Sequence, residues 1–157
     1  MMLILTLLLC LLDDSKWIDF SPKDSSFTAR FPQVPSERAT RTGTLWQFSA
    51  KDRVYNVAKS VVPGGPNPTP SDIAAALDAV RDNIVKRVQA KLLSEKTVQH
   101  RNQAAREFVF ELPEEKGQLR LRCFVAKGHV WEIKVGGPKE YVTGTEVDAF
   151  LDGLKVK

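Results

Sequence analysis

The chain has 157 residues, of which 43% are hydrophobic and 27% charged, as in an ordinary soluble globular domain. This composition excludes an intrinsically disordered chain and leaves enough residues for one sizeable core. The formal net charge is +4, but the lysines and arginines are spread along the chain instead of forming a run. We therefore expect no nucleic-acid partner.

The N-terminus begins with an apolar run over residues 3–12, which ends at Asp13-Asp14. A membrane-spanning helix needs roughly 20 apolar residues, whereas the core of a signal peptide needs about 7 to 15. We therefore expect residues 1–12 to be a hydrophobic leader, residues 13–157 to form one domain, and the protein to be exported to the periplasm or outside the cell. The alternative is that the run is a buried strand or helix.

The two cysteines lie far apart, at Cys10 and Cys123. A lipid on Cys10 would tether the chain to a membrane, but Leu9 is larger than the residue that normally precedes a lipidated cysteine. If the leader is removed after Cys10, Cys123 has no partner within the chain, so no disulfide is expected.

The first half of the domain reads as short strands. Alternating apolar residues predict a hairpin from 17–20 and 27–32, followed by strands at 44–49 and 54–62. The proline- and glycine-rich stretch from Pro63 to Pro70 predicts a loop. It lacks the lysine that a phosphate-binding loop requires, so nucleotide binding is not expected there.

A helix is predicted to start at Thr69-Pro70-Ser71-Asp72, where Thr69 and Asp72 can form a capping box. The helix carries an apolar stripe, which we expect to pack on a sheet. A membrane-surface or partner-binding helix would show the same pattern. The stripe consists of Ile73, Leu77, Val80, Ile84, Val88 and Leu92.

The second half predicts three strands, at 105–112, 118–127 and 129–135. We expect Glu111 to lie opposite Arg120, which puts Phe108, Phe110, Leu119 and Leu121 on the core face. A three-residue loop over 127–129 would place Val125 opposite Trp131, whereas a two-residue loop would mix the faces and is rejected. A second capping box at Thr145-Glu146-Val147-Asp148 predicts a short C-terminal helix.

Several local sequences resemble the PsbP-like superfamily, which includes PsbP, the Mog-type factors and bacterial envelope proteins. They are Phe27–Pro32, the helix from Pro70, the hairpin over 125–133 and the closing segment over 150–156. The resemblance implies an α+β fold, in which an antiparallel β-sheet is covered by a long central helix and a short C-terminal helix in an α/β/α sandwich. It carries no catalytic residue to this chain.

Candidate chemistry is sparse, because the chain has only two histidines, His100 and His129. Neither has a His, Cys or carboxylate at metal-ligand spacing, so we expect no metal site and no cofactor. Cys123 alternates with Leu121 and Val125, which predicts a buried, inert thiol. Ser25, Ser26 and Ser71 lack the context of a catalytic nucleophile, and no catalytic residue is assigned.

Charged residues alternate along the second-half strands and predict a cross-strand ladder on the solvent face, not a pair of catalytic carboxylates. The ladder comprises Glu107, Glu111, Arg120, Arg122, Glu132 and Lys134. Phe124 and Val109 fall on that same face, either as a partner site or beneath a helix.

Two functions are compatible with this sequence. The preferred one is a non-catalytic exported or envelope protein that binds or supports another protein, with membrane contact only through the leader or a lipid on Cys10. The alternative is a small hydrolase or ligand-binding enzyme, which would need a cleft holding His100 or His129 against a carboxylate.

Overall fold

The computed structural model describes residues 17–157, so the expected leader at 1–12 and Cys10 lie outside the described residues. The chain forms ten strands and three α-helices, together with a short 3-10 helix at Pro113–Glu115. The helices are α1 (Pro70–Val88), α2 (Lys139–Val142) and α3 (Thr145–Gly153). The strands are β1 (Ile18–Phe20), β2 (Phe27–Phe31), β3 (Ser36–Ala39), β4 (Gly43–Ser49), β5 (Val54–Val61), β6 (Lys91–His100), β7 (Gln103–Glu111), β8 (Gln118–Ala126), β9 (His129–Gly137) and β10 (Lys155–Val156).

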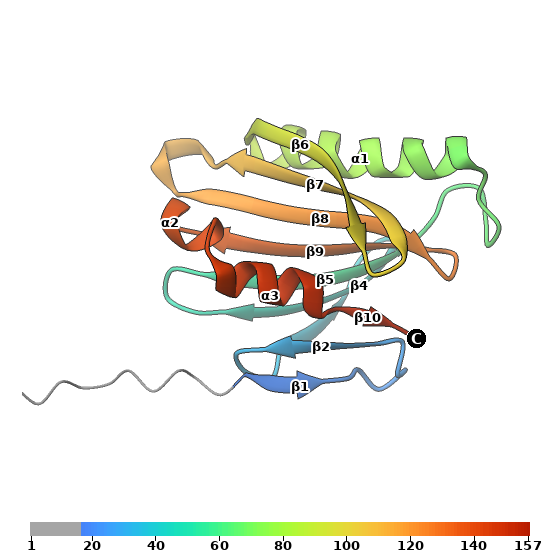
Figure 1. Cartoon of the computed structure of the whole chain (residues 1–157), viewed down its shortest axis with the longest axis horizontal. Helices are drawn as coiled ribbons and strands as arrows, with labels where there is room; N and C mark the ends of the chain where they lie inside the picture. The colour runs from blue at the N-terminus through green and yellow to red at the C-terminus, as the bar shows by residue number, and fades with distance from the viewer. Residues whose placement is uncertain (1–16) are drawn as a thin grey trace, which may run out of the picture.

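The strands form two antiparallel sheets (Figure 1). The main sheet has seven strands in the order β3-β4-β5-β9-β8-β7-β6, and the small sheet has three in the order β1-β2-β10. The predicted α+β fold with antiparallel sheets is confirmed. None of the helices within residues 17–157 is long and apolar enough to cross a membrane.

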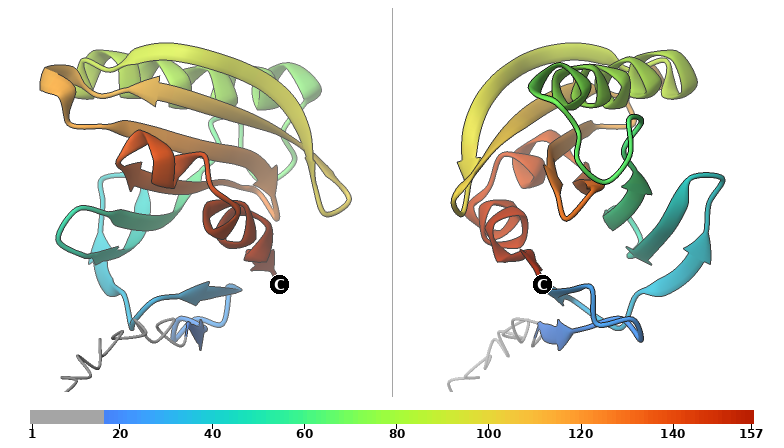
Figure 2. Two further views of the ribbon diagram at one scale, coloured as in Figure 1. Left: turned by 60° about the vertical axis from the view of Figure 1, so that its left-hand side comes forward. Right: turned by 90° about the vertical axis from the view of Figure 1, so that its right-hand side faces the viewer.

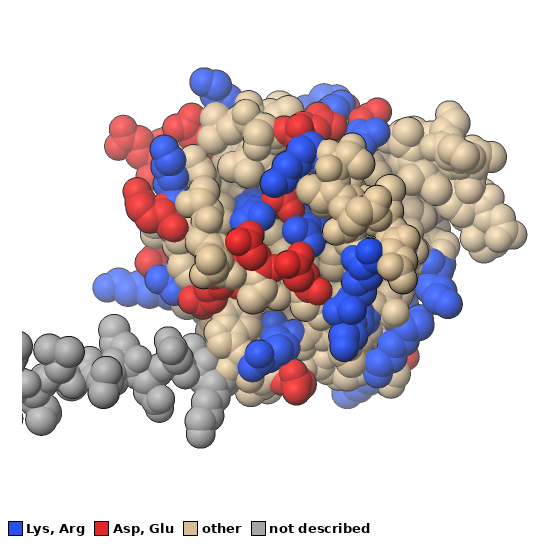
Figure 3. Space-filling view, viewed as in Figure 1, with Lys and Arg blue, Asp and Glu red and all other residues tan. Residues whose placement is uncertain are grey.

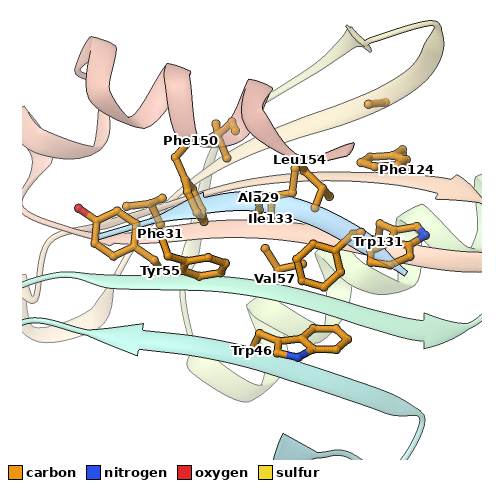
Figure 4. Packing of buried hydrophobic residues seen from close by; sticks show 14 of the residues in the cluster. Ala29, Phe31, Trp46, Tyr55, Val57, Phe124, Trp131, Ile133, Phe150 and Leu154 are labelled. Carbon is orange, nitrogen blue, oxygen red and sulfur yellow. The ribbon is translucent and has the colours of Figure 1, made fainter. Parts of the chain in front are cut away.

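The two faces of the main sheet are covered by different elements (Figure 2). The face here called the α3 face packs against α3 and the small sheet, and its aromatic core is shown in Figure 4. This core includes Trp46, Tyr55, Phe124 and Trp131. The opposite face, called the α1 face, packs Phe108, Phe110, Leu121, Cys123 and Val130 against α1.

The β8–β9 hairpin differs from its predicted register. Lys127 and Gly128 form a two-residue turn with φ of 52° and 73°, as in the type I′ turns that suit twisted hairpins. Phe124 therefore lies opposite Trp131, and the predicted three-residue loop is wrong. Both faces of this hairpin are buried, so apolar side chains on either face are shielded from water. A two-residue loop that places apolar residues on both faces is therefore acceptable.

The β7–β8 register also differs, but by two residues. Val109 lies opposite Arg120 and Glu107 opposite Arg122, so the predicted pairing of Glu111 with Arg120 is wrong. A slip of two residues keeps every side chain on its predicted face, because side chains alternate with a period of two. Phe108, Phe110 and Leu121 are accordingly buried, as predicted.

Helix α1 starts with the predicted capping box between Thr69 and Asp72, but it ends earlier than its apolar stripe suggests. Gln89 adopts a left-handed conformation after Val88, and Leu92 belongs to β6 instead. The capping box predicted for α3 is absent, because Gly144 occupies the N-cap position and makes no side-chain cap.

Strands β3, β6 and β10 are not predicted by the sequence patterns. Strands β3 and β6 are the two edge strands of the main sheet, so each pairs on one side only. All four residues of β3 are exposed, and most of β6 is exposed as well, so neither strand shows an alternating apolar pattern. A register shift between Leu92 and Ser94 interrupts the pairing of β6 with β7.

Candidate functional site

Cys123 is completely buried on the α1 face, among residues that pack against α1. Burial raises the pKa of its thiol well above the ordinary value, so the thiolate needed for nucleophilic attack does not form near neutral pH. The predicted burial of Cys123 is confirmed, and its low reactivity stays a prediction.

His100 lies at the end of β6 and is buried, although the sequence places it in a polar stretch. Its ring stacks on Phe124, with ring centroids 4.4 Å apart. Its Nε2 lies 3.0 Å from the main-chain oxygen of Leu154, and its Nδ1 lies 3.4 Å from a guanidinium nitrogen of Arg122. Burial lowers the pKa of His100, and the ring holds the chain after α3 in place as a neutral group.

His129 is placed at the start of β9, beside the β8–β9 turn. Its Nδ1 donates to the main-chain oxygen of Lys127 at 2.8 Å, a contact within its own hairpin. Neither histidine faces a carboxylate at hydrogen-bond distance within residues 17–157. Ser71 lies in the first turn of α1. The arrangement required by the enzyme hypothesis is not found among these residues.

A charged cluster joins the sheet to α3. Glu107 is only 2% exposed and accepts hydrogen bonds from Arg120 Nε at 2.8 Å and Arg122 Nε at 3.0 Å. The two arginines extend to α3, where Arg120 pairs with Asp148 at 2.7 Å and Arg122 with Asp152 at 2.6 Å. The five side chains alternate in charge, so they hold α3 against the sheet.

The ionisation of Glu107 follows from these contacts. Burial alone would raise the pKa of Glu107, but hydrogen bonds from Arg122 and the charge of Arg120 outweigh it. The pKa of Glu107 therefore lies below its ordinary value, and the carboxylate stays charged. A proton donor for glycoside hydrolysis needs a raised pKa, so this carboxylate fits a structural role.

The predicted ladder is only partly correct. Glu107, Arg120 and Arg122 share the α3 face, whereas Glu132 and Lys134 lie on the α1 face and pair with each other at 2.8 Å. The ladder was also expected on a solvent face, but the part of the α3 face that holds Glu107, Arg120 and Arg122 lies beneath α3. Phe124, expected on this face either as a partner site or beneath a helix, is buried against the ring of His100 from β6.

A second polar group links β5, α2 and α3. The hydroxyl groups of Tyr55 and Tyr141 are hydrogen bonded, and Tyr141 donates to Glu146 at 2.8 Å. Arg53 lies over the Tyr141 ring, 3.6 Å from its centroid. Burial raises the pKa of both phenols, so they remain protonated near neutral pH and serve as hydrogen-bond donors.

The α1 face is covered only in part. Helix α1 packs over the β6–β8 side, where Asp78 pairs with Arg106 and Arg81 with Glu95. Between the C-terminal half of α1 and the β4–β5 side of the sheet lies a groove of about 260 Å³. We call it the α1 groove, and its apolar lining comprises Leu45, Ala58, Val80, Ile84 and Val88.

The charged side chains along the α1 groove leave a net positive charge. Glu132 and Lys134 line it as a neutral pair, whereas Arg87 makes no salt bridge within residues 17–157. Arg38 of β3 lies opposite Leu45 and therefore on the same face. The groove thus combines an apolar lining with a positive rim.

The α1 groove is not predicted by the sequence patterns. The available signals are Leu45, which alternates out of phase with Trp46 and Phe48, and Val85, which lies off the apolar stripe of α1. Val85 and Val88 are 39% and 38% exposed on α1. No set of three or more His, Cys, Asp or Glu side chains suited to a metal ion occurs in residues 17–157.

Comparisons with known proteins identify the fold. No family model and no curated protein matches the sequence. Among solved structures, the cyanobacterial PsbP (CyanoP) of Synechocystis sp. PCC 6803 superimposes with a TM-score of 0.66 at 10% identity, over 93% of this chain and 95% of that one. A Pseudomonas aeruginosa protein of unknown function, PA94, gives a TM-score of 0.49 at 13% identity, over 84% of this chain and 90% of that one. The chain therefore has a PsbP-like fold, as the local sequence resemblance predicted.

Proposed function

We propose that this chain is a non-catalytic exported or envelope protein that binds another protein through the α1 groove. The observation that carries the proposal is the half-covered α1 face, where an apolar groove lies open beside a helix with exposed valines. Exposed apolar surface next to polar side chains is typical of sites where proteins interact.

The charges of the groove indicate the kind of partner. Arg87 lines the groove and Arg38 lies on the same face opposite Leu45, while the carboxylate of Glu132 is already neutralised by Lys134. An amphipathic partner segment with acidic side chains would bury its apolar side on Leu45, Ile84 and Val88 and pair with the arginines. The groove therefore fits an acidic amphipathic segment of a second protein.

A non-catalytic role is supported by the use of the buried polar groups. Each of these groups contacts a second element of the fold, and their hydrogen bonds and ion pairs hold α3 and the chain end in place. The groups are His100, Glu107, Arg120 and Arg122. Export is proposed from the apolar run at residues 3–12.

Binding is tested with matched valine substitutions. A partner is first identified by crosslinking from a photoreactive residue at position 88, and its affinity for the purified full chain is then measured. We expect Val88→Glu to weaken binding about tenfold or more, which corresponds to about 1.4 kcal/mol, because it places a negative charge where an acidic segment binds. The control Val61→Glu, at a 63% exposed valine outside the groove, should leave the affinity unchanged.

Equal affinities for the two variants would contradict the groove as the binding site. Export is tested separately by fusing residues 1–16 to a reporter that is active only outside the cytoplasm, and an inactive fusion would contradict it. Turnover of esters or phosphate esters that disappears in His100→Asn would favour the enzyme hypothesis instead.

A further inference from the structure

A second surface, on the opposite side of the molecule from the α1 groove, is basic. The outer side of the small sheet and the neighbouring β6–β7 turn enclose a hollow of about 450 Å³. Its charged lining consists of Arg30 from β2, Arg101 from the turn, Lys155 from β10 and a single carboxylate, Asp19. Three cations from separate parts of the chain therefore meet around one anion.

The basic surface extends toward the β8–β9 turn. A neighbouring hollow of about 200 Å³ shares Arg101 and adds Lys127. In the space-filling view, Lys and Arg side chains gather over the region of β10 and the β6–β7 turn, at the lower right (Figure 3). We call Arg30, Arg101, Lys127 and Lys155 the basic surface.

These cations are not neutralised by neighbouring carboxylates. Arg30 pairs with Asp19 at 3.5 Å, but both side chains are largely exposed, and such pairs contribute little. Arg101, Lys127 and Lys155 form no salt bridge within residues 17–157. Arg101 donates to the main-chain oxygens of Leu154 and Asp152, at 3.0 Å and 3.4 Å, which fixes its guanidinium beside the hollow.

The first described residue, Trp17, is joined to the basic surface through Arg30. A guanidinium nitrogen of Arg30 donates to the main-chain oxygen of Trp17 at 3.2 Å. Only residues 13–16 separate Trp17 from the apolar run at 3–12. An apolar segment and a basic surface in one chain are two signals that together attach a protein to an anionic membrane.

We propose that the basic surface binds the anionic phospholipid headgroups of a membrane. Each lysine or arginine near such a surface strengthens binding about fivefold, so the cations would hold the domain with its small sheet toward the bilayer. The α1 groove lies on the other side of the main sheet and would remain open to a partner.

The test measures binding of the full chain to lipid vesicles. One set contains phosphatidylcholine with about a third phosphatidylglycerol, and the other contains phosphatidylcholine alone. The test variant combines Arg30→Gln, Lys127→Asn and Lys155→Gln. It leaves Arg101 and its contacts with the chain end intact, and asparagine is tolerated at the positive φ of position 127.

We expect the parent chain to bind the anionic vesicles more tightly than the neutral ones, with an affinity that falls as salt is added. The triple variant should lose roughly a hundredfold in affinity for the anionic vesicles, since each cation accounts for about fivefold. Its binding to neutral vesicles, which depends on apolar contact, should not change.

The control removes three exposed lysines from the other end of the main sheet, as Lys51→Gln, Lys116→Gln and Lys139→Gln. These residues adjoin the ends of β4, β8 and β9, away from the turn at Lys127. An equal loss in this control would show that only net charge matters and would overturn the proposal. So would equal binding of the parent to both vesicles, or saturable binding of inorganic phosphate that is lost in the triple variant.

Discussion

The two faces of the main sheet are buried in different ways. On the α3 face, aromatic rings lie next to charged groups, and Glu107, Arg122 and His100 are buried together with their partners. On the α1 face, the part beneath α1 is mostly apolar, and the part beyond it is left open as the α1 groove. Charged groups are tolerated inside this fold where each one meets an opposite charge or a main-chain group.

The largest expected effect comes from the aromatic part of the α3 face. Trp131 is 1% exposed, packs against Phe27 and donates from Nε1 to the main-chain oxygen of Ala126 at 3.2 Å. Trp131→Ala should lower the free energy of unfolding by about 3–5 kcal/mol, measured by urea denaturation. Val88→Ala, in the open groove, should change it by less than about 1 kcal/mol. If Trp131→Ala were as stable as the parent, the α3 face would not be the principal core.

The next largest change in the free energy of unfolding is expected in the charged part of the α3 face. Glu107→Gln leaves Arg120 and Arg122 without their shared carboxylate. Removing one member of a buried ion pair costs about 3–5 kcal/mol, and we expect the lower end because Asp148 and Asp152 remain as partners. Glu111→Gln, on the exposed end of the same strand, is the matched control and should be nearly neutral.

The same variant tests the pH dependence. Because the pKa of Glu107 is lowered by folding, its stabilisation is complete above the ordinary value of 4.5 and is lost as the pH falls through the lower pKa of the folded state. The free energy of unfolding of the parent, measured with urea, should therefore fall more steeply below about pH 4.5 than that of Glu107→Gln. Parallel curves would contradict the assigned ionisation.

His100 should also make the free energy of unfolding depend on pH, by a smaller amount than Glu107 and in a higher pH range. Folding lowers the pKa of His100 from its ordinary value of 6.5, so the folded state favours the neutral ring. Its contribution is complete above pH 6.5 and is lost as the pH falls from there toward the lower pKa of the folded state. Replacing His100 by Asn should flatten the stability profile in this range, whereas His129→Asn, which keeps His100, should not.

Cys123 reports on the covered part of the α1 face. Since α1 and the sheet enclose the thiol, a thiol reagent should label it roughly a thousandfold or more slowly than in the denatured chain. The rate is measured with and without denaturant, on a Cys10→Ser background that leaves one thiol. Rapid labelling of the folded protein would mean that α1 does not stay packed.

The smallest effect is expected for deletion of residues 1–12. If these residues are a leader, a chain starting at Asp13 should unfold cooperatively with nearly the same stability as the parent. Loss of cooperative unfolding would show that the apolar run is part of the core, and the open groove on the α1 face would be a place for it to pack.

The sequence predicts elements with a strong internal pattern. The capping box at Thr69 and Asp72 locates the start of α1, and alternation locates β2, β5, β7 and β8. It predicts less well where both faces of a strand are buried. Around Phe124 and Trp131, apolar residues occupy both faces, so alternation cannot distinguish a two-residue turn from a three-residue turn.

The charged cluster and the groove depend on tertiary packing, which explains why sequence patterns miss them. Glu107 and Arg122 look like residues of an exposed ladder until α3 covers them. The α1 groove exists because α1 packs over the β6–β8 side of the sheet and leaves the β4–β5 side uncovered, which the apolar stripe of the helix does not indicate. The basic surface joins residues from β2, β10 and two turns that are far apart in the chain.

The two end strands of the main sheet limit how copies of this protein can associate. An uninterrupted edge strand offers unpaired main-chain N–H and C=O groups to another chain, which is how fibrils grow. Here β3 is only four residues long and follows Pro35, while β6 carries an irregularity after Leu92 and charged side chains at Glu95 and Lys96. Both ends therefore disfavour strand-to-strand polymerisation, so the width of the sheet is set within a single chain.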